Sequence, residues 1–403
     1  MADRLTVLVA AREEEDAIGE TVAALRLAFP EAEVIVADDG SRDGTAARAE
    51  RAGARVLRLT RRGKGQALTE AERAAPPGPL LLCDADLRGD LAPLLETGGD
   101  VAVAVFARRR GGGFGIAKGV ARSLVRNRTG LEPREPLSGQ RALSAAAREA
   151  CFPLAPGFGG ETRMTLDALA AGLDYREVEL DLRHRVTGRD LPGFLHRGRQ
   201  LVDILLAAGP LAVNHRGLRL PVVGWLVGVR RSPAVAAVAA LGLSDDLWSG
   251  PERGWRAHLA RGRTTGVLKL VGIPAIGLLA TRRLSGALLV GLAANALNQL
   301  DTKPGRALKA YVAAALVVDA PLGTAVLLAP YDLREMAMLG DAGANTLGAL
   351  LGLSSVRRLT GRSRWLAIGA LAGLNLLGEQ RSLGDLIERT PGLREIDRWG
   401  RPS

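Results

Sequence analysis

The chain has 403 residues, which is too many for one ordinary hydrophobic core, so two domains are expected. Apolar residues make up 47% and charged residues 24%, which excludes a largely disordered chain. Two cysteines exclude a disulfide-stapled fold, and no apolar run follows a basic start, so no signal peptide is expected.

The net charge of +11 is unevenly distributed along the chain. Residues 1–209 hold 30 Lys and Arg against 30 Asp and Glu, whereas residues 210–403 hold 24 against 13. Basic loops between apolar segments are typical of the cytoplasmic face of a membrane protein, and long aliphatic runs argue against a nucleic-acid binder. We therefore predict a domain boundary near residue 209, a membrane partner and no nucleic acid.

The first half alternates strand-like and helix-like stretches. The expected strands are Leu5–Ala10, Glu33–Ala37, Arg55–Leu59, Pro79–Cys83 and Val101–Phe106. The expected helices are Asp16–Phe29, Thr45–Ala52 and Gln66–Ala75. This alternation predicts an α/β domain with a mostly parallel sheet, and such sheets bind ligands beyond the carboxyl ends of their strands.

The second half contains long apolar stretches. They are Pro221–Leu243, Thr265–Thr281, Leu284–Leu297, Leu308–Ala329, Leu347–Val356 and Trp365–Leu377. Only some approach the roughly 20 residues that span a bilayer. The basic loops between them favour an all-α domain with several membrane spans, and a helical bundle with buried helices is the alternative.

Three polar motifs follow expected strands. Residues 38–45 form an acidic, glycine-containing turn, whose carboxylates can accept hydrogen bonds from a base or ribose, although capped turns often have this composition. Residues 61–65 form a basic loop that suits a diphosphate. Asp84 and Asp86 stand one residue apart after an apolar strand, where they can share Mg²⁺ or Mn²⁺.

In this order the motifs resemble family 2 glycosyltransferases with the nucleotide-sugar-binding GT-A fold, closest to the dolichyl-phosphate-mannose-synthase-like and glucosyl-phosphoglycerate-synthase-like members. The similarity spans about residues 4–205 and continues through residues 136–143, 157–162 and 184–189. The stretch around Glu13 has Glu where that family usually has Asn. The resemblance implies a Rossmann-like fold and a metal-dependent, inverting transfer from a nucleotide-sugar donor.

The resemblance also implies a role for individual residues. Donor-binding residues would be Ala11, Glu13, Asp38, Asp39, Lys64 and Asp84, with Asp38 or Asp39 reading the base and Lys64 contacting phosphate. Metal ligands would be Asp84, Asp86 and, as a candidate, His184. The acceptor loop would be Ser138, Gly139, Gln140 and Arg141. Glu161 would lie beside the acceptor as base or orienting group, and Asp86 would share the catalytic role.

Polar clusters also interrupt the apolar stretches of the second half. They include Asp245, Asp246, Asn295, Asn298, Asp301 and Asp341. The spacing of Asn295, Asn298 and Asp301 puts them on one helical face, which could meet the other acids around one Mg²⁺. The alternative is that all of these residues are polar helix ends. Residues 240–380 resemble polyprenyl-phosphate N-acetylhexosamine-1-phosphate transferases, with Lys269 at the basic position of that family.

Together these observations predict a glycosyltransferase domain, residues 1–209, at the cytoplasmic face of the cell membrane, fused to a multi-pass helical domain, residues 210–403. It would move a sugar from a nucleotide-sugar to polyprenyl phosphate or another lipid-linked acceptor. Two alternatives remain at this point. The membrane half could itself transfer a sugar-1-phosphate to polyprenyl phosphate, or it could be a lipid- or partner-binding scaffold with a docked transferase domain.

Overall fold

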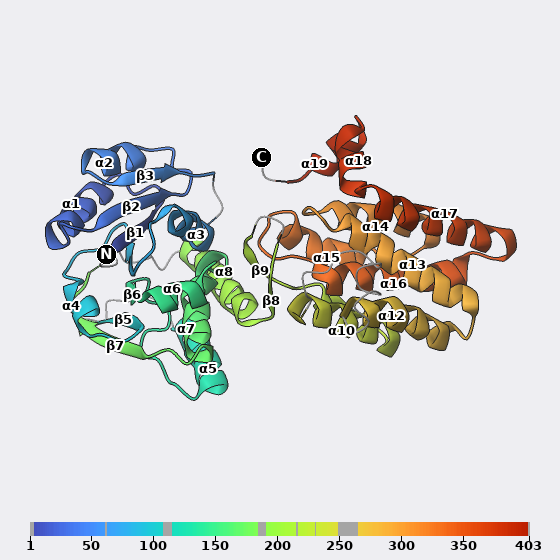
Figure 1. The fold of residues 1–403 in the computed structure, drawn as a ribbon, viewed down its shortest axis with the longest axis horizontal. Helices are drawn as coiled ribbons and strands as arrows, with labels where there is room; N and C mark the ends of the chain where they lie inside the picture. Colours follow the sequence, from blue (N-terminus) through green and yellow to red (C-terminus); the bar gives the residue numbers. More distant parts are fainter. Residues whose placement is uncertain are drawn as a thin grey trace. The chain divides into compact units, whose positions relative to one another are not determined.

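The computed structural model describes residues 4–60, 63–107, 115–183, 191–214, 217–229, 231–248 and 265–401. The chain divides into two compact units, residues 1–209 and residues 210–403 (Figure 1). His184, the candidate metal ligand, and Arg61 and Arg62 of the basic loop lie outside the described residues.

The first unit is built on a seven-stranded sheet with the order β3-β2-β1-β4-β6-β5-β7. The strands are β1 (Thr6–Ala11), β2 (Glu33–Asp38), β3 (Arg55–Arg58), β4 (Leu80–Asp84), β5 (Val101–Phe106), β6 (Arg141–Leu143) and β7 (Tyr175–Leu180). Strands β3, β2, β1 and β4 run parallel, and the short β6 is antiparallel to both of its neighbours. The mostly parallel α/β sheet expected from the sequence is confirmed.

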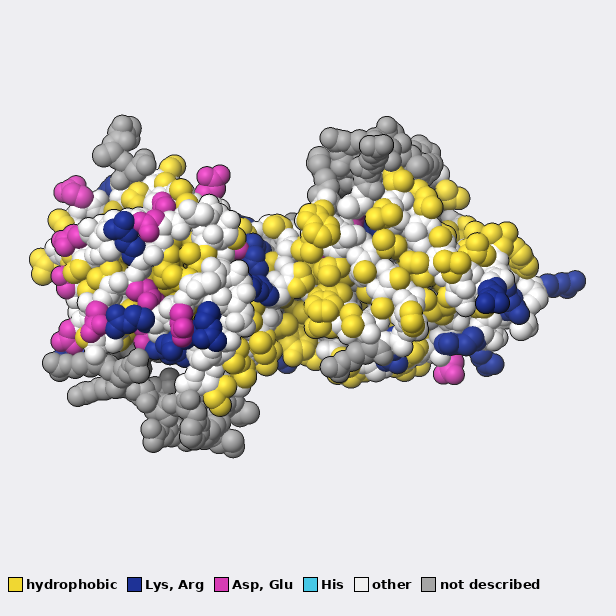
Figure 2. Space-filling view, turned by 90° about the horizontal axis from the view of Figure 1, so that it is seen from below, with side chains coloured by type: hydrophobic (Ala, Val, Ile, Leu, Met, Phe, Trp, Pro, Cys, Tyr) yellow, Lys and Arg dark blue, Asp and Glu magenta, His cyan; other side chains and the backbone are white. Residues whose placement is uncertain are grey.

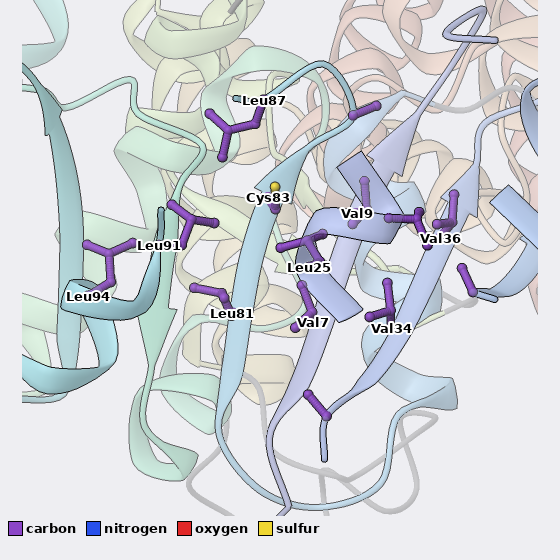
Figure 3. Packing of buried hydrophobic residues seen from close by; sticks show 14 of the residues in the cluster. Val7, Val9, Leu25, Val34, Val36, Leu81, Cys83, Leu87, Leu91 and Leu94 are labelled. Carbon is purple, nitrogen blue, oxygen red and sulfur yellow. The ribbon is translucent and has the colours of Figure 1, made fainter. Parts of the chain in front are cut away.

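Helices cover both faces of this sheet. They are α1 (Ile18–Ala28), α2 (Thr45–Arg51), α3 (Lys64–Ala74), α4 (Ala92–Glu96), α5 (Ile116–Thr129), α6 (Ala145–Cys151), α7 (Gly160–Ala170) and α8 (Leu191–Ala208). Val7 and Val9 of β1 pack with Leu25 of α1, in the cluster drawn in Figure 3. Leu8 points to the opposite face, where Leu68 of α3 packs. Apolar side chains that point alternately to both faces are what a sheet buried on both faces requires.

The strand register brings the sequence motifs to one edge of the sheet. Ala11 pairs with Asp38, and Ala10 pairs with Asp84, so the carboxyl ends of β1, β2 and β4 coincide. Leu82 pairs with Arg141 across the antiparallel β4–β6 ladder. Because β6 runs against β4, the residues just before Arg141 also arrive at this edge.

The second unit is mainly helical. It begins with a hairpin of β8 (Leu211–Val213) and β9 (Arg219–Pro221). Its helices are α9 (Trp225–Gly228), α10 (Pro233–Trp248), α12 (Thr265–Thr281), α13 (Leu284–Leu300), α14 (Arg306–Val318), α15 (Gly323–Asp332), α16 (Gly340–Arg358), α17 (Gly361–Gln380), α18 (Leu383–Arg389) and α19 (Leu393–Arg398). Helices α13 and α16 pack closely at Gly348 and Gly352 of α16, where a side chain would not fit. A Cβ at these positions would lie 2.3 Å and 2.5 Å from the α13 backbone.

The expected membrane spans are not present. Among the helices that the structure describes, none is both long enough and apolar enough to cross a membrane. Helices α12 and α13 have 17 residues each, about 26 Å at 1.5 Å per residue, against a hydrocarbon core of about 30 Å. The longer α16 and α17 carry several charged residues. The predictions of a multi-span membrane domain and of a multi-pass protein at the cell membrane are therefore wrong.

Two of the predicted spans are also interrupted. The stretch Pro221–Leu243 is divided between β9, α9 and α10, and Leu308–Ala329 is divided between α14 and α15. The second break contains Asp319, whose φ of 56° ends α14 in the left-handed region. Part of the apolar residues instead lies on the surface of the unit formed by residues 210–403, as Figure 2 shows. Leu279 and Leu366, for example, are 78% and 73% exposed.

Candidate active site

The turns after β1 and β2 are tied together by hydrogen bonds. The Glu13 backbone N–H donates to Ser41 Oγ (3.0 Å), and the Arg42 backbone N–H donates to the Glu13 carboxylate (3.0 Å). Glu13 has a φ of 53°, in the left-handed region that Asn tolerates better than Glu, and these two bonds hold it there. Ala11 ends β1 directly beside Asp38.

The two acids after β2 have different contacts. Asp38 is buried and accepts hydrogen bonds from the backbone N–H of Ser41 (3.1 Å) and from its hydroxyl. Asp39 accepts a hydrogen bond from the backbone N–H of Gly63 (2.9 Å), at the start of α3. Asp38 therefore stabilises its own turn, whereas Asp39 connects this turn to the basic loop.

Three charged side chains from distant elements meet at the edge of the sheet. Lys64 begins α3, Asp84 ends β4 and Glu161 lies in the first turn of α7. Lys64 Nζ lies 2.6 Å from Asp84 Oδ1 and 2.9 Å from Glu161 Oε1. Burial alone would lower the pKa of Lys64, but the two carboxylates raise it above its ordinary value, so the ammonium stays charged.

Asp84 ends β4, and Asp86 lies in the turn that follows it. Ala85 between them is buried in the apolar core, whereas both acids are partly exposed. Among the described residues of either half, no group of three His, Cys, Asp or Glu side chains forms a ready metal site. Asp84 and Asp86 offer two carboxylates, and a cation held there would need further oxygens from its surroundings.

The predicted acceptor loop is mostly buried. Ser138, Gln140 and Arg141 are 5%, 1% and 0% exposed. The Arg141 guanidinium donates to the carbonyl oxygens of Pro136 (3.1 Å) and Ser138 (2.8 Å), so it shapes the loop rather than facing a substrate. Gln140 bonds to Asp84. Gly139 is the member of the loop that lies over the charged groups.

Replacing Gly139 with alanine should impair activity without unfolding the protein. A Cβ there would lie 2.6 Å from Lys64 Nζ and 2.9 Å from both carboxylate oxygens of Asp84. The ends of these two side chains can move aside, so the cost falls on the geometry of the site rather than on the core. We expect sugar transfer to fall about 100-fold, as for a displacement of roughly 1 Å, with an unchanged melting temperature. Gly119→Ala, on α5 with open space around it, is the matched control.

Four residues of the second site predicted for residues 210–403 lie close together in the structure. Lys269 of α12 forms ion pairs with Asp245 of α10 (2.5 Å) and with Asp341 of α16. Asp246 accepts hydrogen bonds from the backbone N–H groups of Asp341 (2.7 Å) and Ala342 (2.9 Å), and so caps the start of α16. These four residues therefore meet as the sequence predicted, with a lysine between two of the acids.

The remaining residues of the predicted second site lie on α13 and at its end. Asn295 is directed to Asn375 of α17, to which its side chain donates (2.5 Å). Asn298 is partly buried in the last turn of α13. Burial and the charges of Asp332, Asp341 and Asp246 raise the pKa of Asp301 well above its ordinary value. A Mg²⁺-dependent role for these residues stays a prediction.

The second half should lose stability as the pH rises from 5 to 8. Burial and the Asp341 carboxylate raise the pKa of Asp246 to about 7, and burial raises the pKa of Asp341 and Asp332 to about 6. Between the unfolded value near 3.8 and these folded values, unfolding releases protons, so a higher pH favours unfolding. We expect the free energy of unfolding to fall by up to about 5 kcal/mol, measured by denaturant unfolding with a chelator present. In Asp246→Asn the pH dependence should shrink, and an unchanged dependence would contradict this explanation.

Comparisons with known proteins agree with the geometry of the first unit. Residues 6–129 match the family described as Glycosyl transferase family 2. Glucosyl-3-phosphoglycerate synthase of Mycolicibacterium paratuberculosis is 32% identical over 243 residues, which cover 50% of this chain and 71% of that protein. The synthase of Mycolicibacterium smegmatis is 30% identical over 251 residues, which cover 53% and 80%. Glycosyltransferase AglJ of Haloferax volcanii is 33% identical over 172 residues, which cover 40% and 56%.

Among solved structures, the chain is similar to glucosyl-3-phosphoglycerate synthase from Mycobacterium tuberculosis in complex with Mn²⁺, uridine diphosphate and glucosyl-3-phosphoglycerate. The identity is 26%, the TM-score is 0.43, and the match covers 51% of this chain and 80% of that one. The predicted resemblance of residues 240–380 to polyprenyl-phosphate transferases stays a prediction. On the sequence relationship of its first half, the chain belongs to glycosyl transferase family 2 and is a glycosyltransferase.

Proposed function

We propose that the first unit transfers a sugar from a nucleoside diphosphate donor to a small phosphorylated acceptor, with Mn²⁺ or Mg²⁺ at Asp84 and Asp86. The observation that carries this proposal is the convergence of Lys64, Asp84 and Glu161 at the carboxyl edge of the sheet. This edge is where α/β sheets bind ligands, and the chain is a family 2 glycosyltransferase.

The two acids fit a hard divalent cation. Both are partly exposed carboxylates one residue apart, and Mg²⁺ and Mn²⁺ prefer oxygen ligands. Mg²⁺ is commonly held by one or two carboxylates together with substrate phosphates, which suits a site with two described protein ligands. A bound cation would supply positive charge for the leaving diphosphate.

We assign Lys64 to stabilise the negative charge of the same leaving diphosphate. In the transfer, the bond from the sugar C1 to the diphosphate oxygen breaks, and the nucleoside diphosphate leaves with the electron pair. The acceptor oxygen forms the new bond to C1. Lys64 is charged, partly exposed and 2.6 Å from Asp84, so its ammonium can contact the diphosphate oxygens where negative charge develops.

We infer UDP-glucose as the donor and phosphoglycerate as the acceptor. The relatives of M. paratuberculosis and M. smegmatis are named as glucosyl-3-phosphoglycerate synthases. One similar solved structure is named as a complex with Mn²⁺, UDP-glucose and phosphoglyceric acid. The lipid-phosphate acceptor expected from the sequence has a phosphate group in common with phosphoglycerate, but these comparisons do not support a lipid acceptor.

The test is a transfer assay with the full-length chain and Mn²⁺. UDP-glucose, GDP-mannose and other nucleotide-sugars are each incubated with 3-phosphoglycerate or with polyprenyl phosphate, and products are identified by mass spectrometry. We expect a glucosylated phosphoglycerate that forms from UDP-glucose. Transfer only to polyprenyl phosphate would contradict the proposal that phosphoglycerate is the acceptor. No transfer from any donor would contradict the proposed function as a whole. The anomeric configuration of the product tests the inversion expected from the sequence.

Glu161→Gln should separate the two classes of acceptor. A hydroxyl of phosphoglycerate must lose a proton, and we assign its uptake to Glu161, whereas a phosphate acceptor is already ionised. We expect kcat with phosphoglycerate to fall about 100-fold or more. Glu149→Gln, on the exposed side of α6, is the control and should keep the rate of the unmodified protein. If kcat of Glu161→Gln is within twofold of that of the unmodified protein, Glu161 is not the base.

A further inference from the structure

Gln140 lies where three strands of the sheet come together. It directly precedes β6, and because β6 is antiparallel to β4 and β5, this end of β6 lies beside the carboxyl end of β4. The Ala104 backbone N–H of β5 donates to the Gln140 carbonyl oxygen (3.0 Å). The backbone of Gln140 is thus fixed by β5, and its side chain is 1% exposed next to β4.

The Gln140 side chain makes two hydrogen bonds to one residue. Its Oε1 accepts from the backbone N–H of Asp84 (3.1 Å), and its Nε2 donates to Asp84 Oδ2 (2.7 Å). Because a backbone N–H can only donate, the amide oxygen must face the backbone and the amide nitrogen must face the carboxylate. The two bonds fix the Asp84 carboxylate relative to its own main chain.

The two oxygens of Asp84 are held by donors of different charge. Oδ1 faces the Lys64 ammonium (2.6 Å), whereas Oδ2 faces the neutral amide of Gln140 (2.7 Å). A neutral donor orients a carboxylate without cancelling its charge. If Lys64 turns to a diphosphate, as the proposed function requires, the bond from Gln140 still holds Asp84 in place.

The neighbouring residue makes this arrangement rigid. Arg141 is fully buried, and it donates to the carbonyl oxygens of Pro136 and Ser138 and to the Thr165 hydroxyl (2.9 Å). The chain is therefore anchored on both sides of Gln140, by the Arg141 contacts and by β5. A rotation of the Gln140 side chain away from Asp84 would break both of its hydrogen bonds to that residue.

We infer that Gln140 is a positioning residue that holds Asp84 in the orientation that binds the divalent cation, rather than a residue that contacts the acceptor. This inference rests on the proposed function, in which Asp84 is a metal ligand. Loss of a hydrogen-bond partner behind a metal ligand typically weakens metal binding about 10- to 100-fold. Asp84 without Gln140 would keep its charge but lose its fixed direction.

The test is a titration of the full-length chain with Mn²⁺ alone, with free Mn²⁺ read from its electron paramagnetic resonance signal. We expect the dissociation constant to rise about 10- to 100-fold in Gln140→Met, which has a similar size and no hydrogen bonds. Ser144→Ala removes hydrogen bonds at the opposite end of β6 and should bind Mn²⁺ within twofold of the unmodified protein. Asp84→Asn should lose this binding.

The variants distinguish the inference from the function beneath it. If Gln140→Met binds Mn²⁺ within twofold of the unmodified protein while Asp84→Asn does not, the positioning role is wrong and the metal assignment stands. If Asp84→Asn still binds Mn²⁺ like the unmodified protein, or if the unmodified protein shows no such site, the proposed metal centre itself is wrong. If Gln140→Met does not fold, Gln140→Asn is used to test the positioning role. It keeps the amide but is one methylene too short for both bonds, and we expect at least a tenfold loss of affinity.

Discussion

Asp84→Asn should abolish sugar transfer while leaving the protein folded. Asparagine has nearly the same shape, but it removes the negative charge that faces Lys64 and that we propose faces the cation. Loss of the charge that holds the metal at the leaving diphosphate should lower kcat at least about 1,000-fold, which is roughly 4 kcal/mol of barrier. Asp86→Asn should have a similar effect, because we propose that both carboxylates hold the cation.

The control for both variants is Asp90→Asn. Asp90 lies in the same connection and is exposed, and its carboxylate accepts a hydrogen bond from the backbone N–H of Ala92 at the start of α4 (2.9 Å). This variant should lose a little stability and keep its rate. If Asp84→Asn and Asp86→Asn retain near-normal rates and still require the metal, the metal lies elsewhere.

Lys64→Met should be the next most damaging substitution, and it should affect both rate and stability. The ammonium is the cation between Asp84 and Glu161, so its loss leaves two carboxylates facing each other. The three side chains are 10 to 31% exposed, so the loss of folding stability should lie between that of a surface ion pair and that of a buried one, about 1 to 3 kcal/mol. Loss of a charged donor to the leaving diphosphate should lower kcat about 100- to 1,000-fold.

Arg148→Met separates these two effects. Arg148 of α6 is buried to a similar degree and forms an ion pair with Glu72 (2.7 Å), and it also donates to the Pro76 carbonyl (2.6 Å). Its loss should lower the melting temperature as much as Lys64→Met does, with kcat unchanged. If the two variants lose activity in the same proportion as they lose stability, Lys64 has only a structural role.

The edge of the sheet where the site lies could be predicted from the sequence. Each of β1, β2 and β4 is a short apolar run followed at once by polar residues, and parallel strands bring such ends together. The contacts within the site could not be predicted in this way. Glu161 meets Lys64 because α7 and α3 pack on the same face of the sheet, and nothing in either segment encodes that pairing.

The role of Gln140 was missed for a related reason. Its place beside Asp84 depends on the direction of β6, a strand of only three residues between two longer ones. A run this short has no periodicity that would show whether it pairs parallel or antiparallel. Asp38 was likewise predicted to read a base, and its buried hydrogen bonds to Ser41 show that it also holds its own turn.

The error in the second half has a definite physical origin. An apolar stretch of sequence need not form one helix: Leu308–Ala329 is divided where α14 ends, with the left-handed Asp319 as its C-cap. The resulting helices are too short or too charged to span a bilayer. The grouping of Asp245 and Asp341 could be anticipated, because polar residues that interrupt apolar stretches tend to meet one another. Lys269, which lies between them, was indicated only by the family resemblance.

The most direct test of a metal-dependent nucleotide site in the first unit is calorimetric titration of the full-length chain with uridine diphosphate, with Mn²⁺ and then with a chelator. If Asp84 and Asp86 hold a cation that joins the protein to the diphosphate, uridine diphosphate should bind with Mn²⁺ and at least about tenfold more weakly without it. Equal affinity under both conditions, or no binding under either, would contradict the account.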